Sequence, residues 1–397
     1  MPYDLASSSW GPEELAAARA VLDEGRFTMG DRVRRFEEAF AAKFGVKHAV
    51  MVNSGSSANL VAVAALAHLR NRPLQRGDEV IVPAISWATT FHPLQQYGLK
   101  LRFVDIELET LNMDVSRLEE ALTPRTRMVV GVSILGNPAA LDVMRAFCDR
   151  HGLYLLEDNC ESMGASLHGK PCGTFGDVNT FSTFFSHHIS TMEGGMLVTN
   201  NTEIDHLARV IRNHGWTRDV PADSDLFVRK ADGFQEAYRF IMPGYNVRPL
   251  EICGAVGIEQ LKKLDGLVEK RRANAAVFVE AFQHDDRFMI QKENGRSSWF
   301  SFTLILNPTL HIDRVQVMAA MREGGIGFRM ITGGCFLRQD AIRWFDYDTV
   351  GPTPNANVAH DYGFFVGNHP RDLTAEIHEL RRILDGAARR LAPPVTA

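Results

Sequence analysis

Short apolar runs rich in β-branched residues alternate with amphipathic stretches over the first 160 or so residues of the chain. The amphipathic stretches at 58–69 and 139–150 carry apolar residues at helical spacing. This alternation predicts βαβ units around a mostly parallel sheet, so we expect an α/β fold whose ligands bind beyond the carboxyl ends of the strands. The expected strands are EVIVPAIS (79–86), LRFVDI (101–106), RMVVGVSI (127–134) and YLLEDN (154–159).

The pattern changes near Leu250. Residues 250–279 carry apolar side chains at helical spacing and predict one long helix, which shorter strand and helix patterns follow. A chain of 397 residues is also long enough for more than one core. We therefore predict a large domain over residues 1–250 and a smaller C-terminal α/β domain over residues 251–397.

Composition and charge narrow the classes of function. Apolar residues make up 45% of the chain and charged residues 23%, as in an ordinary globular protein. The net charge of −5 and the lack of a basic run give no reason to expect nucleic-acid binding. No stretch has membrane-spanning length, and the polar, acidic N-terminus does not resemble a secretion signal. We therefore expect a cytoplasmic protein that has no membrane partner.

The five cysteines show no CxxC or CxC pairing. Their spacing argues against a local zinc or iron–sulfur motif and against a disulfide framework. Such cysteine usage is typical of a reducing compartment. We expect neither a metal site nor an iron–sulfur cluster.

A turn of small polar residues, NSGSSAN (53–59), lies between an apolar run and a predicted helix. The unpaired amides at the start of a helix form a ready site for an anion such as phosphate. A capped helix without a ligand is the alternative, and this motif alone favours that alternative.

Two further candidates stand where predicted strands end. Trp87 follows VPAIS, where a flat aromatic side chain could stack on a ligand ring, although most tryptophans belong to the core. Asp158 ends YLLED, where a carboxylate could pair with a protonated ring nitrogen. A capping or turn aspartate is the alternative for Asp158.

The most informative segment is FSTFFSHHISTMEGG (181–195). It predicts a strand, a loop with two adjacent histidines, and a glycine pair that allows close backbone approach before the next strand. His187 and His188 could form a metal pair or could be two solvated loop residues. Because neighbouring side chains point apart and no third ligand is near in sequence, local spacing gives little support for a metal site.

Together with EDNCESMGA (157–165) and PGYNVRPLE (243–251), this segment resembles the nucleotide-sugar aminotransferases of the DegT/DnrJ/EryC1/StrS family. The resemblance extends from about residue 27 to residue 370. It implies an enzyme of the pyridoxal-phosphate fold type I, aspartate aminotransferase-like, with a large sheet domain and a smaller one. In that family a lysine that holds the cofactor stands where this chain has His187. Histidine cannot form that covalent link, but it can move protons near neutral pH.

The resemblance also implies how the cofactor is held without a lysine. Backbone amides and a serine hydroxyl would bind its phosphate, the tryptophan would stack on its ring, and the aspartate would pair with the ring nitrogen. The implied cofactor-binding residues are Gly55, Ser56, Trp87, Asp158, Glu161, Ser182 and Asn246. Asn246 would reach the cofactor phosphate of a partner subunit, so the active site would be shared in a homodimer.

Family members without the lysine are sugar 3-dehydratases that use pyridoxamine phosphate, formed from pyridoxal phosphate and L-glutamate. They remove the 3-hydroxyl of a nucleotide-linked 4-keto-6-deoxyhexose and release ammonia, in the biosynthesis of dideoxysugars such as colitose. One branch holds an iron–sulfur cluster in a segment that here, at 213–230, contains no cysteine. The resemblance therefore implies the cluster-free branch, which acts on GDP-4-keto-6-deoxymannose, with His187 as the catalytic residue.

Four residues are candidates for binding the substrate. Arg248 could bind a carboxylate or phosphate with two hydrogen bonds, and a surface salt bridge is the alternative. His214 and Arg218 lie in a segment that could cover the sugar or the amino donor, or that could be a polar surface loop. Arg329 belongs to a region that could close over the substrate, without an assigned role.

Two rival functions remain open from the sequence. An aminotransferase would need a displaced lysine, but no lysine occurs between Lys170 and Lys230. A non-catalytic paralogue could still bind the cofactor, although the residues at Asp158, Ser182 and Asn246 argue against decay.

Overall fold

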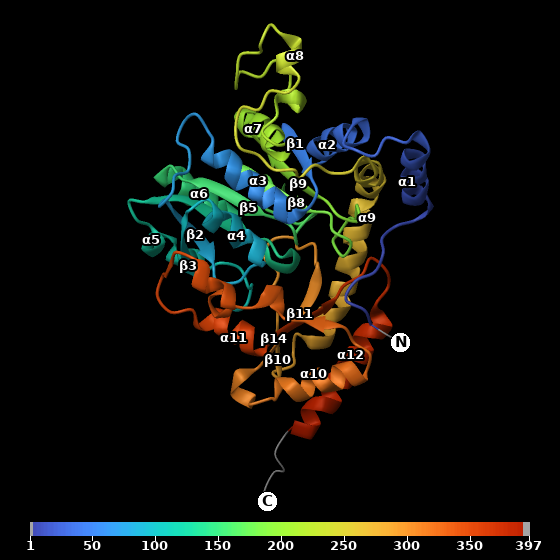
Figure 1. Cartoon of the computed structure of the whole chain (residues 1–397). Helices are drawn as coiled ribbons and strands as arrows, with labels where there is room; N and C mark the ends of the chain where they lie inside the picture. Colours follow the sequence, from blue (N-terminus) through green and yellow to red (C-terminus); the bar gives the residue numbers. More distant parts are fainter. Residues whose placement is uncertain (1–2, 392–397) are drawn as a thin grey trace, which may run out of the picture.

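The computed structural model describes residues 3–391 of the chain. Figure 1 shows two sheets stacked one above the other, with the long helix α9 (Glu251–Phe282) running beside both. The predicted helix at 250–279 is therefore confirmed, and it is three residues longer at its carboxyl end than the sequence pattern indicates.

The large sheet has eight strands in the order β1-β9-β8-β5-β4-β2-β3-β13. The pairs from β8 through β5, β4, β2 and β3 to β13 are parallel, whereas β9 is antiparallel to both of its neighbours. The mostly parallel sheet expected from the sequence is thus confirmed. The strand bounds are β1 His48–Val52, β2 Glu79–Pro83, β3 Lys100–Val104, β4 Thr126–Val132, β5 Tyr154–Asp158, β8 Val178–Ser182, β9 Gly195–Thr199 and β13 Tyr347–Thr349.

Both faces of the large sheet are covered, which explains why its strands are apolar along their whole length. In β2, for example, Val80 and Val82 join the core under one layer of helices, whereas Ile81 joins the core on the opposite face. The first layer contains α3 Gly55–Ala67, α4 Ala88–Gln96, α7 Thr202–Arg212 and α11 Pro354–Tyr362. The opposite layer contains α2 Asp31–Phe44, α5 Leu118–Ala121, α6 Leu141–His151 and part of α9.

The strand directions bring the sequence motifs to one edge of this sheet. Because β5 and β8 are parallel, Asp158 and Ser182 end their strands on the same side. Strand β9 runs the other way and begins there with Gly195, which is paired with both Ser182 and Val52. The turn after β1 therefore reaches the same edge.

A second sheet of four antiparallel strands forms the lower body in Figure 1, in the order β10-β11-β14-β12. Its core also includes residues of α9 and of two C-terminal helices. The bounds of these elements are β10 Phe288–Ile290, β11 Ser301–Leu306, β12 Phe328–Arg329, β14 Gly363–Gly367, α10 Arg314–Glu323 and α12 Thr374–Leu391.

The chain crosses between the two bodies more than once. Strand β13, which follows the second sheet's β12, pairs with β3 of the large sheet. Near the other end of the chain, Tyr3 bridges to Ile326 and donates a hydrogen bond from its hydroxyl to the Gly367 carbonyl at 2.5 Å. The division into residues 1–250 and 251–397 stays a prediction. Strand β13 lies after residue 250 but pairs with the large sheet, and Tyr3 lies before it but contacts the second body.

Four further elements, α1, β6, β7 and α8, complete the α-helices and β-strands of the described residues. Helix α1 (Pro12–Glu24) packs against α9, and β6 (Ser166–Leu167) and β7 (Lys170–Pro171) form a two-stranded hairpin. Residues 214–245, which include α8 (Gly233–Glu236), project from the large-sheet body as an arm beyond α7 (Figure 1).

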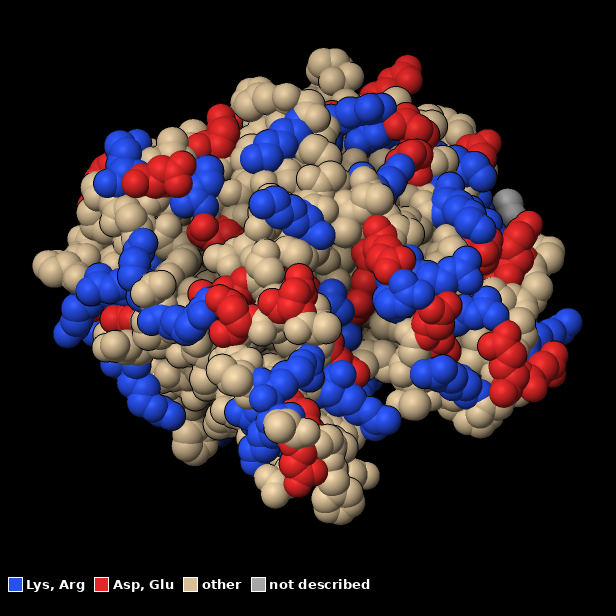
Figure 2. All heavy atoms as spheres, turned by 90° about the horizontal axis from the view of Figure 1, so that it is seen from above, with Lys and Arg blue, Asp and Glu red and all other residues tan. Residues whose placement is uncertain are grey.

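Basic and acidic side chains are interspersed on the face seen from above, where neither sign forms a continuous field (Figure 2).

Candidate active site

Three backbone segments meet at Gly55, the first residue of α3. A Cβ atom at this position would lie 2.6 Å from Ser182 Cβ and 2.8 Å from Cys160 Sγ, closer than a real side chain allows. There is therefore no room for even one methyl group between the turn after β1, the end of β8 and the turn after Asp158. Only glycine fits, because it carries no Cβ atom.

This meeting point has the properties of a phosphate cradle. Helix α3 is 13 residues long, so its first amides, including those of Gly55 and Ser56, carry the positive end of the helix dipole. The Ser54 hydroxyl caps the helix by accepting from the Ser57 amide at 3.0 Å. The Ser56 hydroxyl lies 2.7 Å from the hydroxyl of Thr89. The predicted site is thus built from both the β1 and the β2 turns, and it fits a bound phosphate.

Asp158 is held as a ready acceptor at the end of β5. Its Oδ2 accepts from Asn59 Nδ2 at 2.8 Å and from Thr90 Oγ1 at 2.7 Å, while Oδ1 accepts from the Cys160 amide at 3.1 Å. The carboxylate is 5% exposed and has no cationic partner within residues 3–391. A buried carboxylate of this kind suits a protonated ring nitrogen, which would supply the missing positive charge.

Asn59 and Thr90 were not predicted from the sequence, although spacing could have indicated both. Asn59 lies one helical turn beyond Gly55, and Thr90 lies three residues beyond Trp87 at the start of α4. Thr180 completes this buried network by donating from its hydroxyl to Asn59 Oδ1 at 2.6 Å.

Trp87 stands at the N-cap of α4, beyond the carboxyl end of β2. Its side chain is 56% exposed, which is unusual for a residue that normally buries most of its area. Trp87 is therefore not a buried core residue, which was the alternative role considered from the sequence. An exposed indole at this edge fits a ring-stacking role.

His187 lies in the β8–β9 loop beside the same edge, and its ring Nδ1 is 2.5 Å from the Cys160 carbonyl oxygen. Because a carbonyl oxygen can only accept, Nδ1 carries the proton and Nε2 carries the free lone pair. Burial lowers the pKa of His187 to about 4, a fall that the Cys160 hydrogen bond partly opposes. At neutral pH His187 is therefore a neutral imidazole that can accept a proton at Nε2.

His188 has a different environment. It is fully buried, and its Nε2 donates to the Ser298 carbonyl at 3.2 Å. Burial lowers the pKa of His188 well below its usual range. The two histidines therefore form neither a metal-binding pair nor a pair of solvated loop residues, which were the two alternatives considered from the sequence. Across residues 3–391, no three His, Cys, Asp or Glu side chains gather in a way that could ligate a metal ion.

Glu161 lies one turn after Asp158 and accepts a hydrogen bond at Oε2 from the Leu135 amide at 2.9 Å. Burial, which the Leu135 hydrogen bond partly opposes, and the charge of Asp158 together raise the pKa of Glu161 to about 7. This carboxyl group is therefore close to half protonated at neutral pH. It can donate or accept a proton near the predicted cofactor ring.

Within the described residues, the remaining predicted residues make no hydrogen bond to Asp158 or to Gly55. Asn246 is exposed and accepts from Arg248 Nε at 3.0 Å, and Arg248 has no acidic partner within the described residues. Arg329 is exposed at the end of β12. His214 begins the arm with φ of 63° and donates its amide proton to the Tyr245 carbonyl at 2.8 Å.

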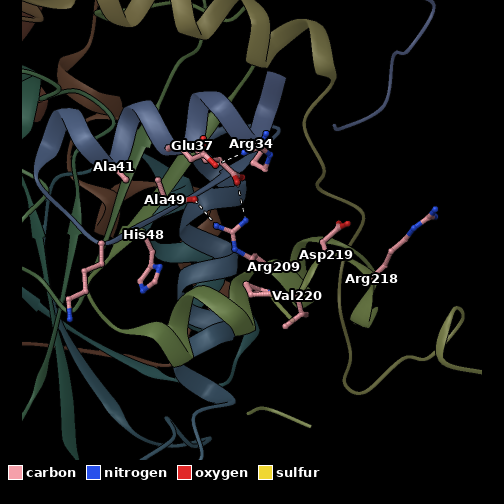
Figure 3. Close-up of a pocket in the computed structure, with 12 residues that line it drawn as sticks. Arg34, Glu37, Ala41, His48, Ala49, Arg209, Arg218, Asp219 and Val220 are labelled. Carbon is pink, nitrogen blue, oxygen red and sulfur yellow. Dashed lines mark hydrogen bonds and ion pairs between the residues drawn. The ribbon is translucent and has the colours of Figure 1, made fainter. Parts of the chain in front are cut away.

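Arg218 instead lines a hollow of about 370 Å³ formed by α2, β1, α7 and the start of the arm (Figure 3). Inside it, Arg209 donates to Glu37 at 3.0 Å and to the Ala49 carbonyl at 3.1 Å. The hollow contains none of the predicted cofactor residues. Two ion pairs lie among its lining residues, Arg34 with Glu38 and Arg209 with Glu37.

Within the described residues, none of the helices combines the length and apolarity that crossing a lipid bilayer requires. All five cysteines are free thiols.

The chain belongs to the DegT/DnrJ/EryC1/StrS aminotransferase family, whose sequence model matches residues 9–380. It is similar to the GDP-4-keto-6-deoxy-D-mannose 3-dehydratase of Yersinia pseudotuberculosis, with 48% identity over 384 residues that cover 96% of this chain and 98% of that protein. The solved structure of the Escherichia coli GDP-4-keto-6-deoxy-D-mannose 3-dehydratase with bound hydrated PLP matches with a TM-score of 0.94. That match has 47% identity and covers 96% of this chain and 99% of the E. coli chain.

A further solved structure, a GDP-4-keto-6-deoxymannose-3-dehydratase with a trapped PLP–glutamate geminal diamine, matches equally well, with a TM-score of 0.94 and 47% identity. It covers 96% of this chain and 100% of that one. These similarities confirm the family and the pyridoxal-phosphate fold type I that the sequence motifs indicate.

The glycine cradle can be tested by replacing Gly55 with alanine. The new methyl group would overlap Ser182 and Cys160, so we expect the affinity for pyridoxal phosphate to fall at least about tenfold and stability to fall by about 1–3 kcal/mol. Cofactor titration by absorbance and thermal melting measure the two effects. Gly266→Ala is the matched control, because nothing lies within 4 Å of its Cβ position in α9. Unchanged cofactor affinity in Gly55→Ala would contradict the cradle.

His187 and Glu161 should have opposite effects on stability as the pH changes. The pKa of His187 is lowered to about 4 in the folded chain, so its share of stability is present above pH 6.5 and is lost as the pH falls. The pKa of Glu161 is raised to about 7, so its share is present below pH 4.5 and is lost as the pH rises. Between pH 5 and pH 7 the two effects oppose each other.

Single variants should therefore unmask each effect. Relative to the parent, Glu161→Gln should gain about 2 kcal/mol of unfolding free energy on going from pH 5 to pH 7, and His187→Asn should lose about 2 kcal/mol over the same interval. Urea unfolding of the cofactor-free protein at both pH values measures this difference. Parallel pH dependence in all three proteins would show that the two groups do not titrate as described.

Proposed function

We propose that this protein is a pyridoxal-phosphate-dependent sugar 3-dehydratase. It removes the 3-hydroxyl of a nucleotide-linked 4-keto-6-deoxyhexose, takes its amino group from L-glutamate and releases ammonia. The observation that carries the proposal is His187, a neutral imidazole held against Cys160 beside the Gly55 turn, at the position where the family's lysine would stand. The similarity to named 3-dehydratases over nearly the whole chain supports the same reaction.

The described residues can hold the cofactor without a covalent link. The amides of Gly55 and Ser56, together with the Ser182 hydroxyl, would bind its phosphate, and Trp87 would cover its ring. Asp158 would keep the ring nitrogen protonated, and Asn59 and Thr90 fix the carboxylate for that role. When bound, the cofactor supplies an electron sink and an exchangeable amino group.

His187 Nε2 is the proton acceptor in this arrangement. The Cys160 carbonyl holds Nδ1–H and thereby fixes both the tautomer and the ring orientation. A pKa near 4 leaves the base unprotonated across the neutral range. The imidazolium formed by proton uptake would then be a strong acid, suited to give its proton to the departing 3-hydroxyl.

The aminotransferase alternative lacks a nucleophile. The nearest lysine before the loop, Lys170, sits in the β6–β7 hairpin with its ammonium 4.2 Å from the centre of the Phe175 ring. No lysine follows until Lys230 in the arm. The dehydratase is therefore the better supported function.

Replacing His187 with asparagine should lower the rate of ammonia release by about 100-fold or more, as expected for loss of a general base. The assay uses protein loaded with pyridoxal phosphate, L-glutamate and the 4-ketosugar. His168→Asn, a change at an exposed histidine with φ of 51°, should retain the parental rate. A His187→Asn rate within threefold of the parent would overturn the assigned base.

GDP is the nucleotide that we propose for the substrate, on the basis of the similarity to GDP-sugar 3-dehydratases over 96% of the chain. Offering the GDP-, CDP- and dTDP-linked 4-ketosugars separately tests this choice. We expect ammonia release from the GDP sugar alone. A higher kcat/KM with the CDP or dTDP sugar would show that GDP is not the preferred nucleotide.

A homodimer with a shared site is also part of the proposal. Asn246 is exposed, and its side-chain oxygen accepts a hydrogen bond from Arg248 Nε at 3.0 Å, which leaves its amide group available to a partner chain. Phe27 and Leu250, each 55% exposed, lie on adjacent segments joined by the Thr28–Leu250 bridge and offer an apolar patch for association.

We also propose a cytoplasmic location, because the five thiols are all free and such usage is typical of reducing compartments.

Mixed dimers can show whether Asn246 acts on the partner. His187→Asn and Asn246→Ala should each be nearly inactive alone. After unfolding and refolding together, half of the dimers should be hybrids with one native site, so about one quarter of the parental activity should return. If Asn246 served its own chain, every hybrid site would carry a defect and no activity would return.

A further inference from the structure

The short segment 297–300, here called the clasp segment, leads into β11 of the second sheet and touches the histidine loop. The Phe300 ring lies 5.1 Å from the ring centre of His187 and 5.7 Å from that of His188. The carbonyl of Ser298 accepts the hydrogen bond of His188. Both histidine rings therefore rest against the clasp segment.

The same segment also supports Glu161. Phe300 donates its amide proton to the Leu135 carbonyl at 3.0 Å, and Ser298 donates to the Gly136 carbonyl at 2.9 Å. Leu135 has a left-handed φ of 53°, a costly conformation for leucine, and its amide is the one that binds Glu161. One four-residue segment thus contacts the supports of both titratable groups of the site.

Arg271 of α9 holds the clasp segment from the opposite side. Its guanidinium donates to the Phe300 carbonyl at 3.1 Å and to the Asn368 carbonyl. Asn368 in turn donates from Nδ2 to the carbonyls of Arg271 and Trp299, at 3.0 and 2.8 Å. The segment is therefore tied to both α9 and the loop after β14.

Arg271 is an unusual residue for a purely structural role. Its side chain is 4% exposed, and within residues 3–391 it has no acidic partner. Burying an unpaired cation is costly, and an apolar side chain could fill the same space at a lower cost. Burial lowers the pKa of Arg271 to about 10, so it stays charged at neutral pH. Arg272, its neighbour, binds the Ser297 carbonyl at 2.8 Å but pairs with Glu269.

We propose that Arg271 is a positioning residue for the dehydration: it fixes the clasp segment so that the Phe300 ring holds His187 in its reactive orientation. This inference rests on the proposed function, in which His187 is the base. It adds a residue from the long helix, outside the cradle, to the machinery that orients that base.

The charge of Arg271 contributes a second effect on the same residue. The charged or titratable groups that act on His187 are Arg271 from α9, Asp158 from β5, and His188 in its own loop. Burial lowers the pKa of His187 most, Arg271 lowers it further, and Asp158 raises it. Removing the guanidinium charge should therefore raise the pKa of His187.

Three variants distinguish the effect of Arg271 on the position of His187 from the effect of its charge on the pKa of His187. Arg271→Met should lower kcat for ammonia release at least about tenfold with KM for the sugar within twofold, and should move the acidic limb of the pH–kcat profile to higher pH. Arg271→Lys keeps the charge but not the paired hydrogen bonds, so kcat should fall while the limb stays in place. Phe300→Leu keeps the carbonyl that Arg271 binds but removes the ring, so kcat should also fall without a shift of the limb.

Arg381→Met is the control. Arg381 also donates to a backbone carbonyl, that of Ala281 at 2.7 Å, but it pairs with Asp285 and Asp385 and lies on α12 in the second body. It should lose thermal stability and keep both kcat and the limb. If Arg271→Met behaved like this control, Arg271 would be only structural and the proposal would be overturned.

Other results are equally decisive. If Arg271→Met does not fold, an unchanged kcat in Arg271→Lys and Phe300→Leu overturns the proposal, and a reduced kcat in both supports it. Failure of the underlying function has a separate signature: the parent itself would then release no ammonia, or His187→Asn would keep the parental rate, whatever the Arg271 variants do.

Discussion

The close packing of the Ser182 and Cys160 side chains against Gly55 is the constraint on which the rest of the site depends. The β1 turn, the end of β8 and the turn after β5 converge there because parallel strands direct their carboxyl ends to one edge of the sheet. Without a Cβ at Gly55 these turns pack directly on one another. The amides of α3, the Asp158 carboxylate and the Cys160 carbonyl are consequently fixed relative to one another before any ligand arrives.

Electrostatic balance is a second property of the site. Burial pushes the pKa of His187 down and that of Glu161 up, so both groups are electrically neutral over much of the range between pH 4 and pH 7. A neutral base and a partly protonated carboxyl can coexist with the ionised Asp158 without crowding one pocket with like charges. This differs from a lysine-centred site, in which the reacting group itself would be a cation for part of the cycle.

Much of this arrangement could be predicted from the sequence. The apolar runs indicate β2 to β5, and glycine with small polar residues marks the turn at Gly55. Other features depend on contacts distant in sequence. Strand β13, Tyr-Asp-Thr, has no apolar pattern and forms only because β3 offers it an unpaired edge. Arg271 sits among other charged residues of α9, and its burial shows only once α9 packs against residues 297–300 and 368. The meeting of His187 with Phe300, 113 positions later, likewise has no local signal.

The pairing of β13 with β3 also has a consequence for how the chain is made. A ribosome releases residues 100–104 long before residues 347–349, so β3 stays an open edge strand until nearly nine-tenths of the chain has emerged. An unpaired parallel edge is a template for association with other chains. The eighth strand of the large sheet therefore comes from the opposite half of the sequence, and it is synthesised late, just before α11, β14 and α12.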